Sequence, residues 1–95
     1  MNNFSNSIWF VYLARCADDS LYAGVTTNLN RRMDEHNNSK KGAKYTRTRR
    51  PVRLVWSMEC SSRSEATKRE AWIKKLDRKK KMLLINNTLD IKCVL

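Results

Sequence analysis

The 95-residue sequence predicts an α+β fold, in which a small three-stranded, mostly antiparallel sheet is flanked by helices. Two segments rich in aromatic and β-branched residues, 8–16 and 21–25, flank a turn-forming cluster and indicate a β-hairpin. A third segment, 52–59, alternates apolar and polar residues with the period of a strand. Segments with helical spacing follow the hairpin and the third strand, so we expect the order strand, strand, helix, strand, helix.

The hairpin carries two tyrosines, Tyr12 and Tyr22, one on each expected strand. If the turn between the strands has an odd number of residues, both side chains point to the same face of the sheet. An even number places them on opposite faces, and the sequence does not decide between these registers. Gly24 follows in the second strand, where the lack of a side chain permits a close approach by backbone or ligand.

The first helix is expected to begin near Asn28, with Thr26 and Thr27 available as capping residues. Two apolar and two ionisable residues then share the helix face that should point inward. They are spaced i, i+3, i+4 and i+7, and they are Leu29, Arg32, Met33 and His36. Residues 37–50 are polar, cationic and without a clear period, which predicts a loop ending at Pro51.

The third strand is expected to have one strongly apolar face. Its members are Val52, Leu54, Trp56 and Met58. The segment 62–65, Ser-Arg-Ser-Glu, fits a capping box and opens a second helix, on which Ala66, Glu70 and Ile73 share one face. Residues 77–84 are predicted either to continue this helix or to form a separate short one.

The length is that of one domain, which we expect to span residues 8–85. Residues 1–7 are expected to form a flexible N-terminus, and residues 86–95 a C-terminal tail that adds an edge strand or frays. The three cysteines are far apart and odd in number, so they supply no disulfide framework and no metal-ligand pair. No apolar run is long enough to span a membrane, and we expect a cytoplasmic location.

The charge balance points to a polyanionic partner. Twenty Lys and Arg residues oppose nine Asp and Glu residues, which gives a formal net charge of +11. Such an excess repels itself in a compact chain, but beside nucleic acid each phosphate contact releases condensed counterions. The cations expected to hold the nucleic-acid backbone are Lys41, Lys44, Arg47, Arg49, Arg50 and Lys74.

Three ionisable residues, Arg32, His36 and Glu70, stand where the two helices should present apolar side chains. A buried charge without a partner is costly, so each should have a partner or a chemical role. A long side chain at the edge of such a face also reaches solvent, and that interpretation suffices for any one of them alone. Three exceptions on two core-facing helices favour a functional site.

Over residues 8–84 the chain resembles the GIY-YIG endonuclease family, in particular its small stand-alone bacterial members. The segment 10–12, Phe-Val-Tyr, stands where the family has Gly-Ile-Tyr, and the segment 22–24, Tyr-Ala-Gly, stands where it has Tyr-Ile-Gly. Phe10 and Ala23 depart from the family pattern in the way the stand-alone subgroup does. The resemblance implies the family's α+β fold, with the order β-β-α-β-α.

The resemblance also implies a metal-dependent phosphodiester hydrolase. Glu70 matches the family's metal-binding glutamate and would hold Mg²⁺ or Mn²⁺, while Arg32 would bind phosphate oxygens. Either Tyr12 or His36 would activate the attacking water, and Tyr22 would orient it. Tyrosine, with an unperturbed pKa of about 10, is the more demanding base, and histidine starts nearer neutrality. The sequence does not choose between them.

Two other functions are compatible with the same residues. One is a nucleic-acid-binding module of the same fold with weak or no turnover, and the other is a protein-interaction domain that recruits a larger repair enzyme. We expect DNA rather than RNA as the partner, a role in repair or nucleic-acid processing, no membrane contact, and a monomer or weak dimer that also binds a partner protein.

Overall fold

A computed structural model describes residues 8–86, and these contain three strands and four helices. The predictions for residues 1–7 and for the tail beyond residue 86 fall outside the described residues. In chain order the elements are β1 (Trp9–Arg15), β2 (Leu21–Thr26), α1 (Leu29–Asn38), α2 (Lys44–Arg47), β3 (Arg53–Cys60), α3 (Arg63–Lys74) and α4 (Arg78–Ile85).

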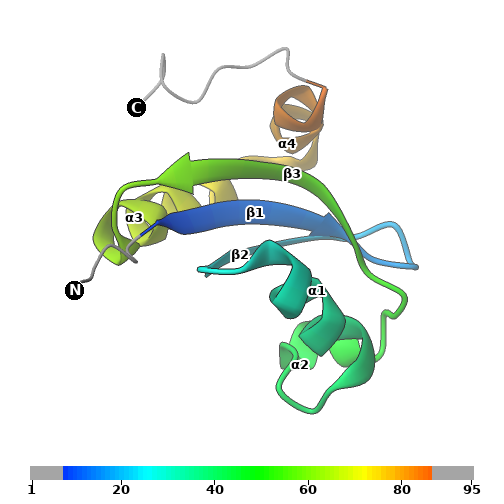
Figure 1. Ribbon diagram of the computed structural model, residues 1–95. Coiled ribbons are helices and arrows are strands. Elements are labelled where there is room, and N and C mark those ends of the chain that lie inside the picture. The colour runs from blue at the N-terminus through cyan, green and yellow to red at the C-terminus, as the bar shows by residue number, and fades with distance from the viewer. Residues whose placement is uncertain (1–7, 87–95) are drawn as a thin grey trace, which may run out of the picture.

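The three strands form one sheet in the order β2-β1-β3, and both pairings are antiparallel. Helices α1 and α2 lie on one side of the sheet, and α3 and α4 lie on the other (Figure 1). The predicted α+β fold, with a three-stranded antiparallel sheet flanked by helices, is confirmed. Within residues 8–86, no helix is both long and apolar enough to cross a bilayer.

The hairpin turn has an odd number of residues, 17–19. The Cys16 backbone N–H donates to the Ser20 carbonyl at 2.9 Å, which closes the turn, and Asp19 adopts a φ of 72°. Aspartate tolerates this left-handed backbone better than most residues do. Of the two registers left open by the sequence, this turn selects the one in which Tyr12 and Tyr22 share a face.

Each face of the sheet covers its own core. On the α3/α4 side, Val11 and Leu13 of β1 pack with Ile73 of α3 and Leu84 of α4. On the α1 side, buried β1 residues of the opposite parity, Tyr12 among them, pack against Leu29 and Met33 of α1. Odd-numbered β1 residues such as Val11 and Leu13 therefore point to the α3/α4 side of the sheet, and even-numbered ones such as Tyr12 point to the α1 side.

The prediction of a single apolar face on β3 is wrong. A β-bulge shifts the β1–β3 register between Leu13, which pairs with Trp56, and Ala14, which pairs with Leu54. The extra residue, Val55, reverses the parity of the strand. As a result Trp56 and Met58 join the core on the α3/α4 side, whereas Val52 joins the core on the α1 side.

The helix caps correct the sequence prediction at one end and confirm it at another. Helix α1 is capped by Asn28 itself, whose side chain accepts from the Arg31 N–H at 3.0 Å, and not by Thr26 or Thr27. The Thr26 hydroxyl instead accepts from the Asn28 N–H at 3.1 Å and supports the cap. At α3, the Ser62 hydroxyl accepts from the N–H of Glu65 at 3.1 Å, which confirms Ser62 as the cap. The Glu65 carboxylate, however, accepts from the N–H of Ser61 at 2.7 Å and not from that of Ser62, so only half of the predicted capping box forms.

Two short helices, α2 and α4, form where the sequence predicted a loop and left a helix undecided. The predicted loop 37–50 contains the single helical turn α2, which is too short to show a period in sequence. Residues 77–84 do not continue α3, because Asp77 caps a separate helix by accepting from the Lys80 N–H at 2.9 Å.

Candidate active site

Tyr12 and Tyr22 come together because their strands pair in the odd-turn register. Tyr12 lies opposite Gly24, Ala14 lies opposite Tyr22, and the two ring centroids are 6.4 Å apart. The Tyr12 ring lies across the backbone of Gly24. A Cβ atom at position 24 would be 2.5 Å from the Tyr12 Oη atom and 2.7 Å from Cζ. The close approach expected at Gly24 is therefore made by the first tyrosine.

His36, near the end of α1, is fully buried and fixes the Tyr12 hydroxyl. Its Nε2 atom is 2.7 Å from the Tyr12 Oη atom. The Ala43 backbone N–H donates to Nδ1 at 3.2 Å, so Nδ1 must be unprotonated. A neutral imidazole then carries its proton on Nε2 and donates it to the tyrosine. The buried Thr46 hydroxyl lies 3.2 Å from Nδ1 and donates to the Ala43 carbonyl at 2.7 Å.

Burial moves the pKa values of this pair away from neutrality. Desolvation raises the pKa of Tyr12 to about 12, although the neighbouring Arg32 guanidinium pulls it down. Desolvation also lowers the pKa of His36 to about 4, with the Arg32 charge acting in the same direction. At neutral pH both groups are uncharged, and both histidine nitrogens are engaged. In this structure the two bases considered from the sequence are hydrogen-bonded to each other.

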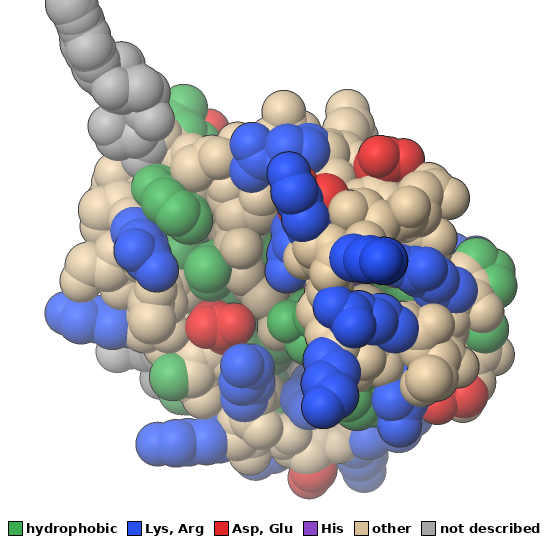
Figure 2. All heavy atoms as spheres, turned by 90° about the horizontal axis from the view of Figure 1, so that it is seen from below, with side chains coloured by type: hydrophobic (Ala, Val, Ile, Leu, Met, Phe, Trp, Pro, Cys, Tyr) green, Lys and Arg blue, Asp and Glu red, His purple; other side chains and the backbone are tan. Residues whose placement is uncertain are grey.

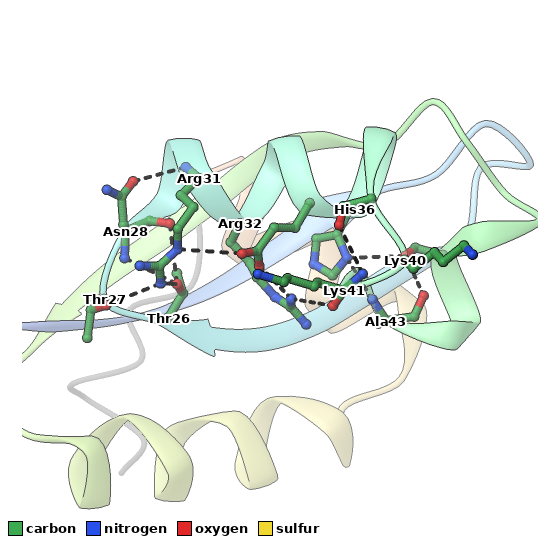
Figure 3. Close-up of polar contacts among 12 residues, drawn as sticks. Thr26, Thr27, Asn28, Arg31, Arg32, His36, Lys40, Lys41 and Ala43 are labelled. Carbon is green, nitrogen blue, oxygen red and sulfur yellow. Dashed lines mark hydrogen bonds and ion pairs between the residues drawn. The ribbon is translucent and has the colours of Figure 1, made fainter.

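Arg32 is held in a defined orientation on the same side of the sheet. Its Nη1 atom donates to the Glu35 carboxylate at 2.8 Å and to the Lys41 carbonyl at 2.9 Å. Figure 3 shows Arg32 and His36 projecting from α1 toward the segment that carries Lys41 and Ala43. The guanidinium side chain is about a quarter exposed, and it also makes a hydrogen bond to the Tyr12 phenol that lowers the pKa of that phenol, so part of its donor set is shared with the cluster.

The second tyrosine is the more accessible one. Tyr22 is half-buried, and its ring meets the His36 ring edge-on with centroids 5.3 Å apart. The Tyr45 ring stacks on Tyr22 at 5.9 Å, and the Arg49 guanidinium lies 4.0 Å from the centroid of Tyr45. These contacts pack α2 against Tyr22, while Tyr45 itself stays 41% exposed.

Glu70 lies on α3, the helix that packs against the opposite face of the sheet. Its carboxylate forms an ion pair with Lys74 at 3.4 Å, and its side chain is 19% exposed. The carboxylate is close enough to add to the raised pKa of Tyr12, as the smallest of the causes. The structure thus gathers Tyr12, Tyr22, Arg32 and His36 into one cluster, and within residues 8–86 no hydrogen bond or ion pair joins Glu70 to it.

The cations predicted to bind nucleic acid divide into free and engaged groups. Lys41 and Lys44 are exposed, and Figure 2 shows many Lys and Arg side chains on the face of the molecule that carries α1 and α2. Arg47 is exposed but donates to the Lys40 carbonyl at 2.7 Å, and Arg49 pairs with Asp18 at 3.0 Å.

Arg50 serves the fold. Its guanidinium donates to the His36 carbonyl, and its Nη2 atom donates to the Ser39 carbonyl at 2.7 Å, which caps the end of α1. Lys74 is tied to Glu70.

Several groups that shape the cluster were missed by sequence reasoning. Glu35, Lys41 and Ala43 position Arg32 and His36, the last two through backbone atoms. Only Glu35 left a signal, since it follows Arg32 at the i, i+3 spacing of a helical ion pair. Backbone donors and acceptors leave none.

The buried histidine predicts a pH-dependent stability. Folded His36 gains a proton only below about pH 4, whereas the ordinary value is 6.5. Between these values the unfolded chain binds more protons, so stability falls as the pH is lowered through this window. At about 1.4 kcal/mol per pKa unit the loss is roughly 3 kcal/mol. Urea unfolding of the wild type across this range measures it.

His36→Gln is the matched variant for this measurement, because it keeps a polar side chain that does not titrate. Its unfolding free energy should change much less between pH 6.5 and pH 4. The buried, neutral histidine is refuted if the wild type has a flat profile in this window, or if the variant has the same slope.

Comparisons with known proteins agree with this fold. The family model described as GIY-YIG catalytic domain matches residues 8–83. A UPF0213 protein of Desulfotalea psychrophila, DP2720, is 57% identical over 77 residues, which are 81% of this chain and 70% of the relative. The UPF0213 protein YazA of Bacillus subtilis is 49% identical over 76 residues, 80% of this chain and 76% of the relative.

A solved structure is also similar. The solution NMR structure of the UPF0213 protein BH0048 from Bacillus halodurans aligns with a TM-score of 0.53 at 44% identity, and the alignment covers 83% of each chain. The names of these relatives state no activity.

Proposed function

Because the chain belongs to the GIY-YIG family, as its motifs predicted, we propose that it is a metal-dependent endonuclease that hydrolyses phosphodiester bonds in DNA. The observation that carries the proposal is the convergence of two tyrosines, Arg32 and His36 on one face of the sheet, and the role of Glu70 rests on its match to the family's metal-binding glutamate. The proposal includes a role in DNA repair or processing in the cytoplasm.

In this proposal Arg32 binds the scissile phosphate. Two hydrogen bonds from one of its terminal nitrogens, to Glu35 and to the Lys41 carbonyl, fix the plane of the guanidinium. The exposed part of the guanidinium is then preoriented toward a phosphate oxygen, and charge that develops on phosphorus is stabilised without rearrangement.

Tyr22 is assigned the orientation of the attacking water, because it is the phenol of the cluster that retains contact with solvent. Tyr12 and His36 act as positioning residues beneath it, through the edge-on contact of His36 with Tyr22 and the hydrogen bond to Tyr12. The water oxygen bonds to phosphorus and its proton passes to a phosphate oxygen. The bond from phosphorus to the ester oxygen then breaks, and that oxygen takes up this proton and leaves as a hydroxyl group.

The metal ion of this proposal would be held by Glu70. Residues 8–86 contain no group of three or more His, Cys, Asp or Glu side chains suited to a metal. A single carboxylate fits Mg²⁺ or Mn²⁺ only together with substrate phosphates and waters, a ligand set common for Mg²⁺. Such an ion would stabilise the leaving oxygen and the charge on phosphorus. Lys74, which now pairs with Glu70, would have to move aside.

The test is a cleavage panel of single-stranded, duplex, flapped and branched DNA, with the matching RNA strands, with and without Mg²⁺. We expect the wild type to cleave at least one DNA substrate, and only when the metal ion is present. Failure across the whole panel, or equal cleavage in EDTA, contradicts the proposal.

One observation favours a second function, a nucleic-acid-binding module of the same fold without turnover. Tyr12 and His36 are fully buried and hydrogen-bonded, as in a packed core. This alternative predicts salt-sensitive DNA binding and no cleavage in the same panel.

A further inference from the structure

A second cationic site lies at the turn of the hairpin. A surface pocket of about 580 Å³ is lined by Arg15, Asp19 and Arg53, together with the adjoining backbone. Arg15 and Arg53 are directly opposite each other in the β1–β3 register. Like charges in that position are destabilising unless something compensates them.

The protein compensates this charge only in part. Asp19 accepts from Arg15 Nε at 2.5 Å and from Arg78 Nη2 at 3.1 Å, so one carboxylate serves two guanidinium groups. Within residues 8–86, Arg53 is exposed and makes no ion pair. The pocket therefore keeps an excess positive charge. Among the described residues Arg15 is engaged through Nε alone, which leaves its two terminal nitrogens for a ligand.

The arginines of the pocket and the tyrosine cluster lie on opposite sides of the sheet. Arg15 has the parity of Val11 and Leu13, which face α3 and α4, whereas Tyr12 faces α1. Arg78, at the start of α4, reaches the turn from that same side. In Figure 1 the turn, the start of β3 and the end of β1 meet at one end of the sheet.

We propose that Arg15 and Arg53 bind a phosphate of a nucleic-acid backbone at this pocket, with Arg78 adding charge. Planar guanidinium groups suit the paired oxygens of a phosphodiester. This inference rests on the proposed function, and it specifies the substrate: the backbone that flanks the cleaved bond passes around the β1–β2 turn onto the second face. A mononucleotide does not reach both places.

The test measures binding of a fluorescein-labelled single-stranded DNA oligonucleotide in EDTA, so that no cleavage occurs, over a range of salt concentrations. Arg53→Gln removes a cation that has no ion pair. It should raise Kd several-fold and lower the slope of log K against log salt by about 0.7, the value for one phosphate contact on a single strand.

Lys68→Gln is the matched control, because Lys68 is an exposed cation on α3 and its loss changes the net charge equally. Its salt slope should equal that of the wild type. Arg53→Glu separates binding from folding: it replaces the opposed like charges by an Arg–Glu pair, so Tm should stay the same or rise while affinity falls further.

If Arg53→Gln binds like Lys68→Gln, or if the wild type does not bind in EDTA, the second site is overturned. Neither outcome decides the proposed hydrolysis, which the Mg²⁺ panel tests separately. Conversely, an Arg53 effect without any cleavage supports this site and removes the proposed catalysis.

Discussion

Glu70→Gln is expected to lower the rate of metal-dependent DNA cleavage by about a hundred- to a thousandfold while leaving the fold intact. Glutamine keeps the size of the side chain but loses the charge that binds a hard cation, and losses of this size follow the removal of one group that stabilises transition-state charge. The fold should persist, because the one ion pair that Glu70 makes within residues 8–86, to the exposed Lys74, contributes little.

The measurement compares initial cleavage rates at saturating Mg²⁺, with Tm as the check on folding. Glu59→Gln is the matched control, since it removes the same charge from an exposed carboxylate on β3. Its rate should equal that of the wild type. A Glu70→Gln protein that cleaves normally, or a control that loses as much activity, argues against a metal site at Glu70.

Gly24→Ala is expected to destabilise the protein by about 1–3 kcal/mol and to abolish cleavage. The added methyl group would lie 2.5 Å from Oη and 2.7 Å from Cζ of Tyr12. That ring is fully buried and hydrogen-bonded to His36, so it has no free direction in which to move. The phenol must leave the imidazole, or β2 must separate from β1. Urea unfolding and the His36 imidazole signals in NMR spectra report these changes.

Tyr12→Phe supplies the control, because it removes the oxygen that makes the shortest contact with the new methyl group. The double variant Tyr12→Phe/Gly24→Ala should therefore lose less stability than the sum of the two single variants. If the stability losses of the two single variants add fully, or if Gly24→Ala is as stable as the wild type, close packing of Tyr12 against Gly24 is not the reason for a glycine at this position.

Helical spacing was sufficient to predict half of this site. Arg32 and His36 were expected on the inward face of α1 because they follow Leu29 at i+3 and i+7, and the structure places both there. The hairpin register was left open because it depends on a turn of three residues. That turn requires Asp19 in the left-handed region, where a glycine is the usual sequence signal, and the turn contains no glycine.

The bulge in β3, the backbone contacts in the site and the face covered by α3 could not be predicted, because none of them depends on a pattern of side chains. The β3 bulge sits at Val55, an apolar residue among apolar residues, so the alternation of 52–58 conceals the change of face. The groups that orient His36 and Arg32 include the Ala43 N–H and the Lys41 carbonyl, which any residue could supply. For Glu70, spacing predicts a side chain that faces the sheet, but not which face its helix covers.

A titration with paramagnetic Mn²⁺ tests most directly whether these residues form one metal-dependent site. With a phosphorothioate-protected DNA strand bound, we predict selective broadening of the NMR signals of Glu70, Tyr12 and Arg32, lost in Glu70→Gln. Broadening confined to another carboxylate, such as those of Asp18 and Asp19, with sharp signals around Glu70, would contradict the account.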